Sequence, residues 1–310
     1  MGTPYAYFQK QFVPLAEANV NVMTHAFNYG TAVFEGIRGN WNEDEGQIYL
    51  FRLPEHFQRL RRSCRILKMD LPYSDAELAD ITVRLVAMCG YNEDIYLRPI
   101  AYKSSEVVGV RIHNLESDFL IYVTPFGPYL DIEKGARCCT SSWRRVEDTG
   151  IPARAKINGI YVNSALAKTE AIENGLDEAI MLNEDGHVSE GSGENIFIVE
   201  DGRLITPSVS SNILVGITRE TVITLAREEL GVETIERPID RSELYVADEC
   251  FMTGTAAHVT PVTEVDRRPV GDGARGPITA DIQRLYFEVV RGKSAKYARW
   301  CTPCYTKVKT

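Results

Sequence analysis

The sequence predicts an α+β protein of two domains, and three observations support this. Apolar stretches typical of strands come in clusters, and helical stretches stand beside the clusters instead of alternating with single strands. The chain has 310 residues, enough for two domains of ordinary size. The stretch TPFGPYLDIEKG (124–135) has two prolines and two glycines, which is typical of a linker. We therefore expect a small N-terminal α/β domain at 1–123, a linker at 124–136 and a larger domain with a β-rich core at 137–310.

The first half is predicted to hold short strands, two helices and two longer strands. Short extended segments cover 5–20, and GQIYLFRL (46–53) has the composition of a strand. Pro54 then begins a helix in which Phe57, Leu60 and Cys64 recur at helical spacing. A second helix covers 75–89. The strands DIYLRPIAYKS (94–104) and DFLIYVTPF (118–126) complete this half.

The second half is predicted to hold a meander flanked by three helices. The stretch 156–175 ends in a helix that Gly175 terminates. Residues 177–207 form extended runs separated by the turn signals NEDG and EDG. A helix follows at 215–231, with Val222 and Leu225 on its apolar face and Gly231 as its stop. The stretch 247–265 closes the sheet, and a last helix covers about 277–291.

Composition argues against several classes of function. The net charge of −9 disfavours non-specific binding to nucleic acid or to an anionic membrane. No run of eighteen apolar residues is present, which argues against a membrane span. The odd number of cysteines, seven, fits buried free thiols in a reducing compartment, and the first fourteen residues show no secretion signal. These observations predict a cytoplasmic protein.

Cys301 and Cys304 form a CxxC pair in the basic tail. One such pair supplies only two of the four ligands that a structural zinc needs, so we expect no metal site there. A redox role is one interpretation of the pair. A surface terminus is the interpretation that we favour.

Motif searches leave lysine chemistry as the best hypothesis. The five histidines form no HExxH, and the chain has no GxSxG, no phosphate loop and no GxGxxG before a helix. Lys156 stands among apolar and small residues in IPARAKINGIYVNS. A desolvated amine in such surroundings attacks carbonyl groups readily. The alternative is a lysine whose stem covers apolar surface while its head stays in water.

Pyridoxal phosphate (PLP) is the cofactor that such a lysine suggests. PLP bound as a Schiff base needs an acid facing its pyridine nitrogen and donors for its phosphate. Glu190, set among glycines in HVSEGSGEN, is the candidate acid, and the small neighbours let the backbone approach the ring. The amides at 216–218 begin a helix whose dipole favours an anion, and Thr255 adds a hydroxyl.

The chain as a whole resembles a branched-chain amino-acid aminotransferase, a member of PLP fold type IV. The matching stretches are HAFNYGTAVFEGIR, EHFQRL, IYLRPI, SSWRR, KINGIYVNSALAKTEA, HVSEGSGENIF, GITRE, ECFMTGTAAHVTPV and the ending RWCTP. They occur in family order over almost the whole chain. The resemblance implies the two-domain fold of the D-amino-acid-aminotransferase-like group.

The resemblance also implies roles toward the cofactor. Lys156 would be the Schiff-base lysine, Glu190 would face the pyridine nitrogen, and Tyr161 would bind the ring oxygen. The phosphate clamp would consist of Arg59, the amides of Ile217 and Thr218, and the Thr255 hydroxyl. Each has a structural alternative: an exposed helix arginine for Arg59, a core aromatic for Tyr161, and a helix N-cap for Thr218.

Substrate residues follow from the same resemblance. The side-chain pocket would be lined by Tyr29, Phe34, Phe126 and Tyr129, with Val108 and Val110 from a partner subunit. Arg98, aided by Tyr29 and Tyr129, would take the γ-carboxylate of glutamate. Tyr96 and the amides of Thr255 and Ala256 would hold the α-carboxylate. Phe126 stands where some bacterial relatives have tryptophan, and the segment 103–118 matches the family least.

The expected activity is ping-pong transamination of leucine, isoleucine and valine with 2-oxoglutarate. The expected partners are these small molecules and a second copy of the chain, in a dimer or a hexamer, which completes each site across the interface. Three rivals stay open: a transaminase of D-amino acids or (R)-amines, an aminodeoxychorismate-type lyase, and a PLP-binding protein without activity. The YLRPI and TGTAA segments argue against the first rival.

Overall fold

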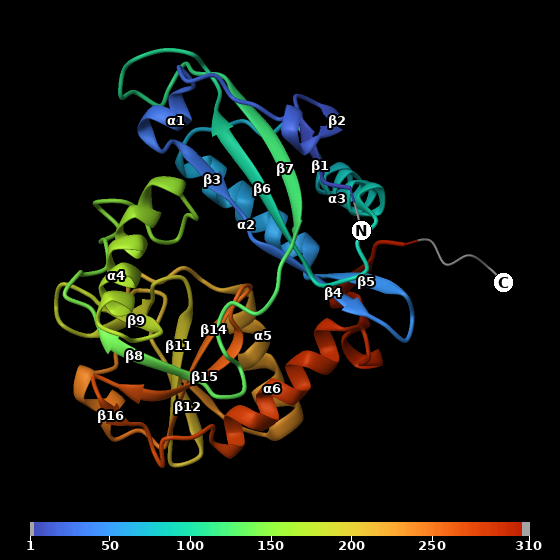
Figure 1. The fold of residues 1–310 in the computed structure, drawn as a ribbon. Coiled ribbons are helices and arrows are strands. Elements are labelled where there is room, and N and C mark those ends of the chain that lie inside the picture. Colours follow the sequence, from blue (N-terminus) through green and yellow to red (C-terminus); the bar gives the residue numbers. More distant parts are fainter. Residues whose placement is uncertain (1–2, 306–310) are drawn as a thin grey trace. The chain divides into compact units, whose positions relative to one another are not determined.

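The computed structural model of the chain describes residues 3–305, which divide into two compact units (Figure 1). Unit 1 comprises Met1–Gly127, Ala155–Gly159 and Glu288–Thr310, and unit 2 comprises Pro128–Arg154 and Ile160–Phe287. The domain limits that we drew from the sequence, 1–123 and 137–310, stay a prediction. Their outer ends, 1–2 and 306–310, lie outside the described residues.

Unit 1 contains one antiparallel sheet with strands of unequal length. Its strands are β1 (Tyr5–Phe8), β2 (Gln11–Pro14), β3 (Ala32–Phe34), β4 (Ile37–Asn42), β5 (Gln47–Phe51), β6 (Ile95–Lys103), β7 (Ser117–Pro125) and β17 (Cys301–Pro303). The described strands follow the order β17-β5-β4-β6-β7-β1-β2, and β3 pairs with β6. The two nine-residue strands, β6 and β7, run side by side in Figure 1 and pair along their whole length.

The helices of unit 1 are those that the sequence predicted, with one addition. They are α1 (His25–Tyr29), α2 (Leu53–Ile66) and α3 (Asp75–Cys89), with 3-10 turns η1 (Leu15–Glu17) and η5 (Ala295–Trp300). Helix α2 buries Phe57, Leu60 and Cys64, which confirms its predicted apolar face. Helix α3 begins with a capping box made by Ser74 and Glu77. The short helix α1 was not anticipated.

The last described residues, 301–305, are buried only in part: Cys304 is buried and Pro303 is exposed, so the surface terminus that we favoured is wrong for Cys304. Strand β17 pairs with β5, and Cys304 is only 5% exposed. The Trp300 ring, which stacks on Tyr297 and meets Phe51 edge-on, explains this burial because it carries the tail onto the sheet. Both thiols of the CxxC pair are free.

Unit 2 is built on a second sheet flanked by helices, which confirms the α+β class. Its strands are β8 (Ala136–Thr140), β9 (Glu178–Leu182), β10 (Val188–Gly191), β11 (Asn195–Glu200), β12 (Arg203–Thr206), β13 (Thr234–Glu236), β14 (Glu249–Gly254), β15 (His258–Val265) and β16 (Arg268–Pro269). Within residues 3–305 their order is β10-β9-β8-β15-β14-β11-β12-β13, and β16 pairs with β15. Strand β8 lies parallel to both of its neighbours.

The remaining helices end where the sequence predicted. They are α4 (Tyr161–Glu173), α5 (Ile217–Leu225) with a π-helical turn (Ala226–Leu230), and α6 (Pro277–Val290), with 3-10 turns η2 (Asn158–Ile160) and η4 (Arg241–Tyr245). Gly175 and Gly231 follow two of these ends at φ +73° and +66°, values that favour glycine. None of the helices in the described part of the chain is long and apolar enough to cross a bilayer.

A buried carboxylate fixes the start of α6. Glu249, 6% exposed, accepts hydrogen bonds from the amides of Ile278 (3.0 Å) and Thr279 (2.8 Å) and from the Thr279 hydroxyl (2.6 Å). The carboxylate therefore satisfies amides that a helix N-terminus otherwise leaves without partners, and its charge suits the helix dipole.

We expect Glu249→Ala to lower the free energy of unfolding by about 2 kcal/mol, because three donors lose their buried acceptor. Urea unfolding followed by circular dichroism measures this change. The exposed Glu233→Ala serves as the control and should stay within about 0.5 kcal/mol of the wild type. Equal effects of the two substitutions would contradict the role given to Glu249.

Candidate active site

The tripeptide Phe34–Glu35–Gly36, at the end of β3, organises the predicted site residues of unit 1. The Phe34 ring centroid lies 4.8 Å from Lys156 Nζ and 4.2 Å from Arg98 Cζ, so two cations meet one aromatic ring. A Cβ atom on Gly36 would collide with the Tyr96 hydroxyl. Glycine at this position therefore leaves room for the Tyr96 hydroxyl next to the backbone of residue 36.

The Lys156 backbone is held from two sides. Its carbonyl accepts a hydrogen bond from Phe34 N (3.0 Å), and its amide donates to Ser63 Oγ of α2 (3.1 Å). A β-bridge between Val33 and Ile157 continues this pairing. The side chain is half-buried and lies before the turn η2 that leads into α4. The amine thus projects from a fixed backbone beside the Phe34 ring.

Arg59 is held by a buried carboxylate that the sequence analysis did not single out. Glu35, with no exposed surface, accepts from Arg59 Nε and Nη2, both at 2.7 Å, and contacts His56 Nδ1 at 2.7 Å. Burial alone would raise the pKa of Glu35, but the charge and hydrogen bonds of Arg59, and then of His56, lower it to about 2. Burial lowers the pKa of His56, which favours its neutral form. Arg59 is therefore a fixed cation and not an exposed helix arginine.

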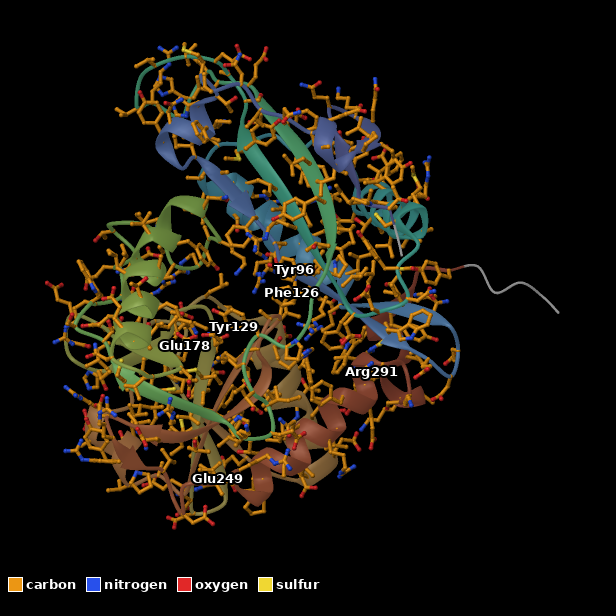
Figure 2. The ribbon with its side chains drawn as sticks, in the orientation of Figure 1. Tyr96, Phe126, Tyr129, Glu178, Glu249 and Arg291 are labelled. Atoms are coloured by element: carbon orange, nitrogen blue, oxygen red, sulfur yellow. The ribbon has the colours of Figure 1, made fainter. Side chains whose placement is uncertain are left out.

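Arg98 and Tyr96 offer donors for a carboxylate. Arg98 Nη2 donates to the Tyr96 hydroxyl at 2.9 Å, while Arg98 Nε is buried and has no hydrogen-bond partner among the described residues. Figure 2 shows Tyr96 and Phe126 next to each other, and their ring centroids are 5.1 Å apart. A buried donor without an acceptor is costly, and a carboxylate would satisfy it.

Helix α1 and the segment after β6 carry Tyr29, Val108 and Val110. The Tyr29 hydroxyl accepts from Gly109 N at 2.9 Å, and His25 Nε2 lies 2.7 Å from Gly109 O. Val108 and Val110 are 81% and 83% exposed. The structure therefore presents these two valines on the surface of unit 1.

Glu190 is the buried carboxylate that the sequence predicted in unit 2. Its Oε1 lies 2.8 Å from Arg145 Nη2, and its Oε2 accepts from Asn195 Nδ2 (3.1 Å) and Leu214 N (3.0 Å). Glu190 and Arg145 are 5% and 6% exposed. Three donors thus hold the carboxylate in one orientation. Arg145 lies in the SSWRR stretch and Asn195 in SEGSGEN, but neither residue was given a role from the sequence.

The second glutamate of this stretch has the opposite environment. Glu194, 4% exposed, receives one hydrogen bond, from Gly193 N at 3.1 Å. Burial, and after it the charge of Glu178, raises the pKa of Glu194 to about 8. At neutral pH, Glu194 is therefore largely a neutral acid, whereas Glu190 is matched by an arginine.

The start of α5 offers backbone amides. Gly216 is its N-cap and has no side chain to cap the helix, and a Cβ atom there would collide with Asn195 Oδ1. Thr218 and Ile217 occupy the first turn and are buried. Thr218 is therefore not the N-cap that the structural alternative required. The amides of this turn and the helix dipole suit a phosphate group.

The other predicted residues of unit 2 lie on α4 and on the turn between β14 and β15. Tyr161 is the first residue of α4 and is half-buried, so it is not a core aromatic. Thr255 and Ala256 belong to the turn 255–257 and are also half-buried. Tyr129, 42% exposed, precedes β8.

The family model described as "Amino-transferase class IV" matches residues 32–265. A relative from Aquifex aeolicus, with the printed name "Probable branched-chain-amino-acid aminotransferase", is 52% identical over 98% of this chain and 97% of its own. The chain belongs to the class IV aminotransferases. The resemblance that the motifs indicated is thereby confirmed.

Two solved structures of class IV aminotransferases resemble this one over nearly the whole chain. The branched-chain aminotransferase of Thermoproteus uzoniensis, solved with norvaline, has a TM-score of 0.94 and 46% identity and covers 98% of this chain and 100% of its own. The branched-chain amino acid aminotransferase of Thermobaculum terrenum, solved in its PLP form, has a TM-score of 0.94 and 40% identity, with 99% and 100% covered.

We expect Glu35→Gln to lower the free energy of unfolding by about 3 kcal/mol at pH 7, because it leaves Arg59 without its buried countercharge. The folded-state pKa of Glu35 is depressed from 4.5 to about 2. The carboxylate therefore stabilises the protein above pH 4.5, and this contribution is lost as the pH falls toward 2.

Urea titrations at about pH 7, 4.5 and 3 test this expectation, and the difference from the wild type should shrink at the lowest pH. Glu55→Gln is the matched control on α2, because Glu55 pairs with Arg52 at 2.9 Å with 30% of its side chain exposed. It should cost less than about 1 kcal/mol. A pH-independent effect of Glu35→Gln would contradict the assignment.

Proposed function

We propose that this class IV aminotransferase transfers the amino group of leucine, isoleucine or valine to 2-oxoglutarate, with PLP as its cofactor. The products are branched 2-oxo acids and L-glutamate, and the kinetics are ping-pong. The observation that carries the proposal is the amine of Lys156, held on a fixed backbone near Phe34 in the unit that also fixes Arg59 and Arg98. Full-length relatives that are named branched-chain aminotransferases support the substrate class.

The residues present suit PLP. The uncapped amides of Ile217 and Thr218 and the guanidinium of Arg59 match a phosphate, with the Thr255 hydroxyl as a further donor. The oriented carboxylate of Glu190 matches a protonated pyridine nitrogen, and Tyr161 would bind the ring oxygen. Bound PLP supplies a carbonyl carbon for the amino group and an electron sink that makes the substrate Cα proton acidic.

Lys156 has two tasks in this proposal. Its Nζ would hold the cofactor through its aldehyde carbon. When a substrate amine takes that place, Nζ would accept the proton from the substrate Cα. Glu190 would hold the pyridine nitrogen with a carboxylate that Arg145 and two further donors orient.

Two kinds of side chain have to be accepted by one pocket. Aromatic walls from Phe34, Phe126 and Tyr129 suit leucine, isoleucine and valine. Arg98 takes the γ-carboxylate of glutamate, and the absence of a partner for its Nε among the described residues supports this assignment. Tyr96 and the amides of Thr255 and Ala256 hold the α-carboxylate.

We infer that a second copy of the chain covers the exposed valines of unit 1. Val22 and Phe27, 75% and 70% exposed, share this surface with Val108 and Val110, because α1 is bonded to the segment that carries them. An apolar patch of this kind is typical of an interface between subunits. The copy would contribute its Val108 and Val110 to the neighbouring pocket, in a dimer or a larger assembly of dimers.

A reducing compartment, the cytoplasm, fits the cysteines. All seven are free, and Cys64, Cys89 and Cys250 are buried.

Replacing Lys156 or Glu190 should separate cofactor binding from turnover. We expect Lys156→Ala to lower kcat by about 10³-fold or more, and Glu190→Gln to lower it by about 10²-fold while still binding PLP. The visible band of the bound cofactor, followed after mixing with L-leucine, measures the half-reaction. The exposed Lys134→Ala is the control and should match the wild type.

The same mixing experiment separates the rivals. A wild-type band that responds to D-alanine or an (R)-amine and not to L-leucine would contradict the proposed substrate class. Pyruvate release without a 2-oxo acid acceptor would indicate a lyase.

We expect Val108→Asp to shift the protein toward the monomer in light scattering after gel filtration, because it places a charge in an apolar interface. Val246→Asp is the control, since Val246 is 78% exposed and belongs to unit 2. A wild type that is monomeric at micromolar concentration, or equal effects of the two substitutions, would contradict the interface.

A further inference from the structure

The segment 104–116, which joins β6 to β7, is held at its tip through one residue, Gly109. Figure 1 shows this loop beside helix α1 of the same unit. Within residues 3–305, every hydrogen bond made by residues 107–115 involves Gly109, whose φ of +139° favours glycine. Val108 and Val110 flank it and are 81% and 83% exposed. The conformation at residue 109 therefore decides where these two valines stand.

Both polar backbone groups of Gly109 are bound by side chains of α1. His25 Nε2 lies 2.7 Å from Gly109 O, and Gly109 N donates to the Tyr29 hydroxyl at 2.9 Å. His25 and Tyr29 are the first and the last residue of this five-residue helix, so they share one face, and their ring centroids are 4.6 Å apart. Helix α1 therefore holds the tip of the segment with two neighbouring side chains.

The contacts of His25 define which ring nitrogen carries the hydrogen. A carbonyl oxygen only accepts, so Nε2 is the donor to Gly109 O. In the neutral ring Nδ1 is then an acceptor, and the Thr31 hydroxyl, 2.7 Å away, donates to it. The His25 side chain has no exposed surface, and its backbone amide donates to Ser105 O at 2.9 Å. His25 thus binds the segment at two points, Ser105 and Gly109, with its ring in one orientation.

We propose that His25 is a positioning residue for branched-chain substrates, which holds Gly109 so that Val108 and Val110 reach the pocket of the neighbouring copy. This inference rests on the proposed function and on the pocket role of the two valines. Apolar substrate side chains gain binding energy in proportion to the area that the pocket covers. Without the bond from His25 the tip is free to move, and the valines cover the substrate less well. His25 acts through Gly109, because its own ring is fully buried.

Half-reaction kinetics with two amino acids of different size test this role. The second-order rate constants for L-leucine and L-2-aminobutyrate are measured on the visible band of the PLP-loaded enzyme. Aminobutyrate has a shorter apolar side chain, so it depends less on the valines. We expect His25→Asn to lower the ratio of the leucine constant to the aminobutyrate constant about fivefold. Asparagine keeps a polar atom for Thr31 but is too short to replace the donor at Nε2.

A conservative variant separates positioning from a merely structural role. Glutamine places an amide donor where Nε2 stands, so His25→Gln should restore the ratio to within about twofold of the wild type. His113→Asn, which changes an exposed histidine of the same segment, is the matched control and should leave the ratio unchanged.

Gly109→Ala tests the tip of the segment without a change in α1. A Cβ atom there meets no other atom within 4 Å, so the substitution strains the backbone at φ +139° without a steric clash. It should lower the ratio to a similar degree, and it carries the expectation by itself if His25→Asn fails to fold. Adding His25→Asn to Gly109→Ala should lower the ratio little further.

Equal losses for both amino acids, or a ratio in His25→Gln as low as that in His25→Asn, would overturn the inference. A wild type that reacts with both amino acids, with an unchanged ratio in His25→Asn and Gly109→Ala, overturns this inference alone. A wild type that reacts with neither amino acid overturns the proposed function as well.

Discussion

The ion pair between Glu190 and Arg145 is the constraint on which the account of unit 2 depends. A carboxylate only 5% exposed keeps its charge only where partners offset the loss of water, and Arg145, Asn195 and Leu214 N are those partners. The hydrogen bonds fix the plane of the carboxylate as well as its charge. A fixed negative charge at this point is what a protonated pyridine nitrogen requires, whereas Glu194, without an arginine, is largely neutral.

Unit 1 contains the reverse arrangement, in which a buried carboxylate orients a cation. Arg59 is oriented by Glu35, which accepts hydrogen bonds from two of its nitrogens. His56 is a third partner of the buried carboxylate. Arg98 differs, because its Nε lacks an acceptor among the described residues. An arginine already satisfied suits a permanently bound phosphate, and one with a donor left over suits a substrate that comes and goes.

Much of the fold and part of the site could be predicted from the sequence. Helices α2 and α3 follow from apolar spacing and a capping box, and Lys156 and Glu190 stand out because their neighbours are apolar or glycine. The partners Glu35 and Arg145 could not be found this way, because a charged residue in a connecting segment looks the same in sequence whether solvent or a countercharge faces it. Burial of Cys304 depends on long-range pairing of β17 with β5, which local pattern does not show.

The central claim is that one amine, Lys156 Nζ, is joined to PLP in the resting enzyme. Borohydride reduction of the PLP-loaded protein, followed by peptide mapping with mass spectrometry, tests it most directly. The account predicts a phosphopyridoxyl group on the peptide that contains Lys156 and on no other lysine. A label on another residue, or no label on a protein that binds PLP, would contradict it.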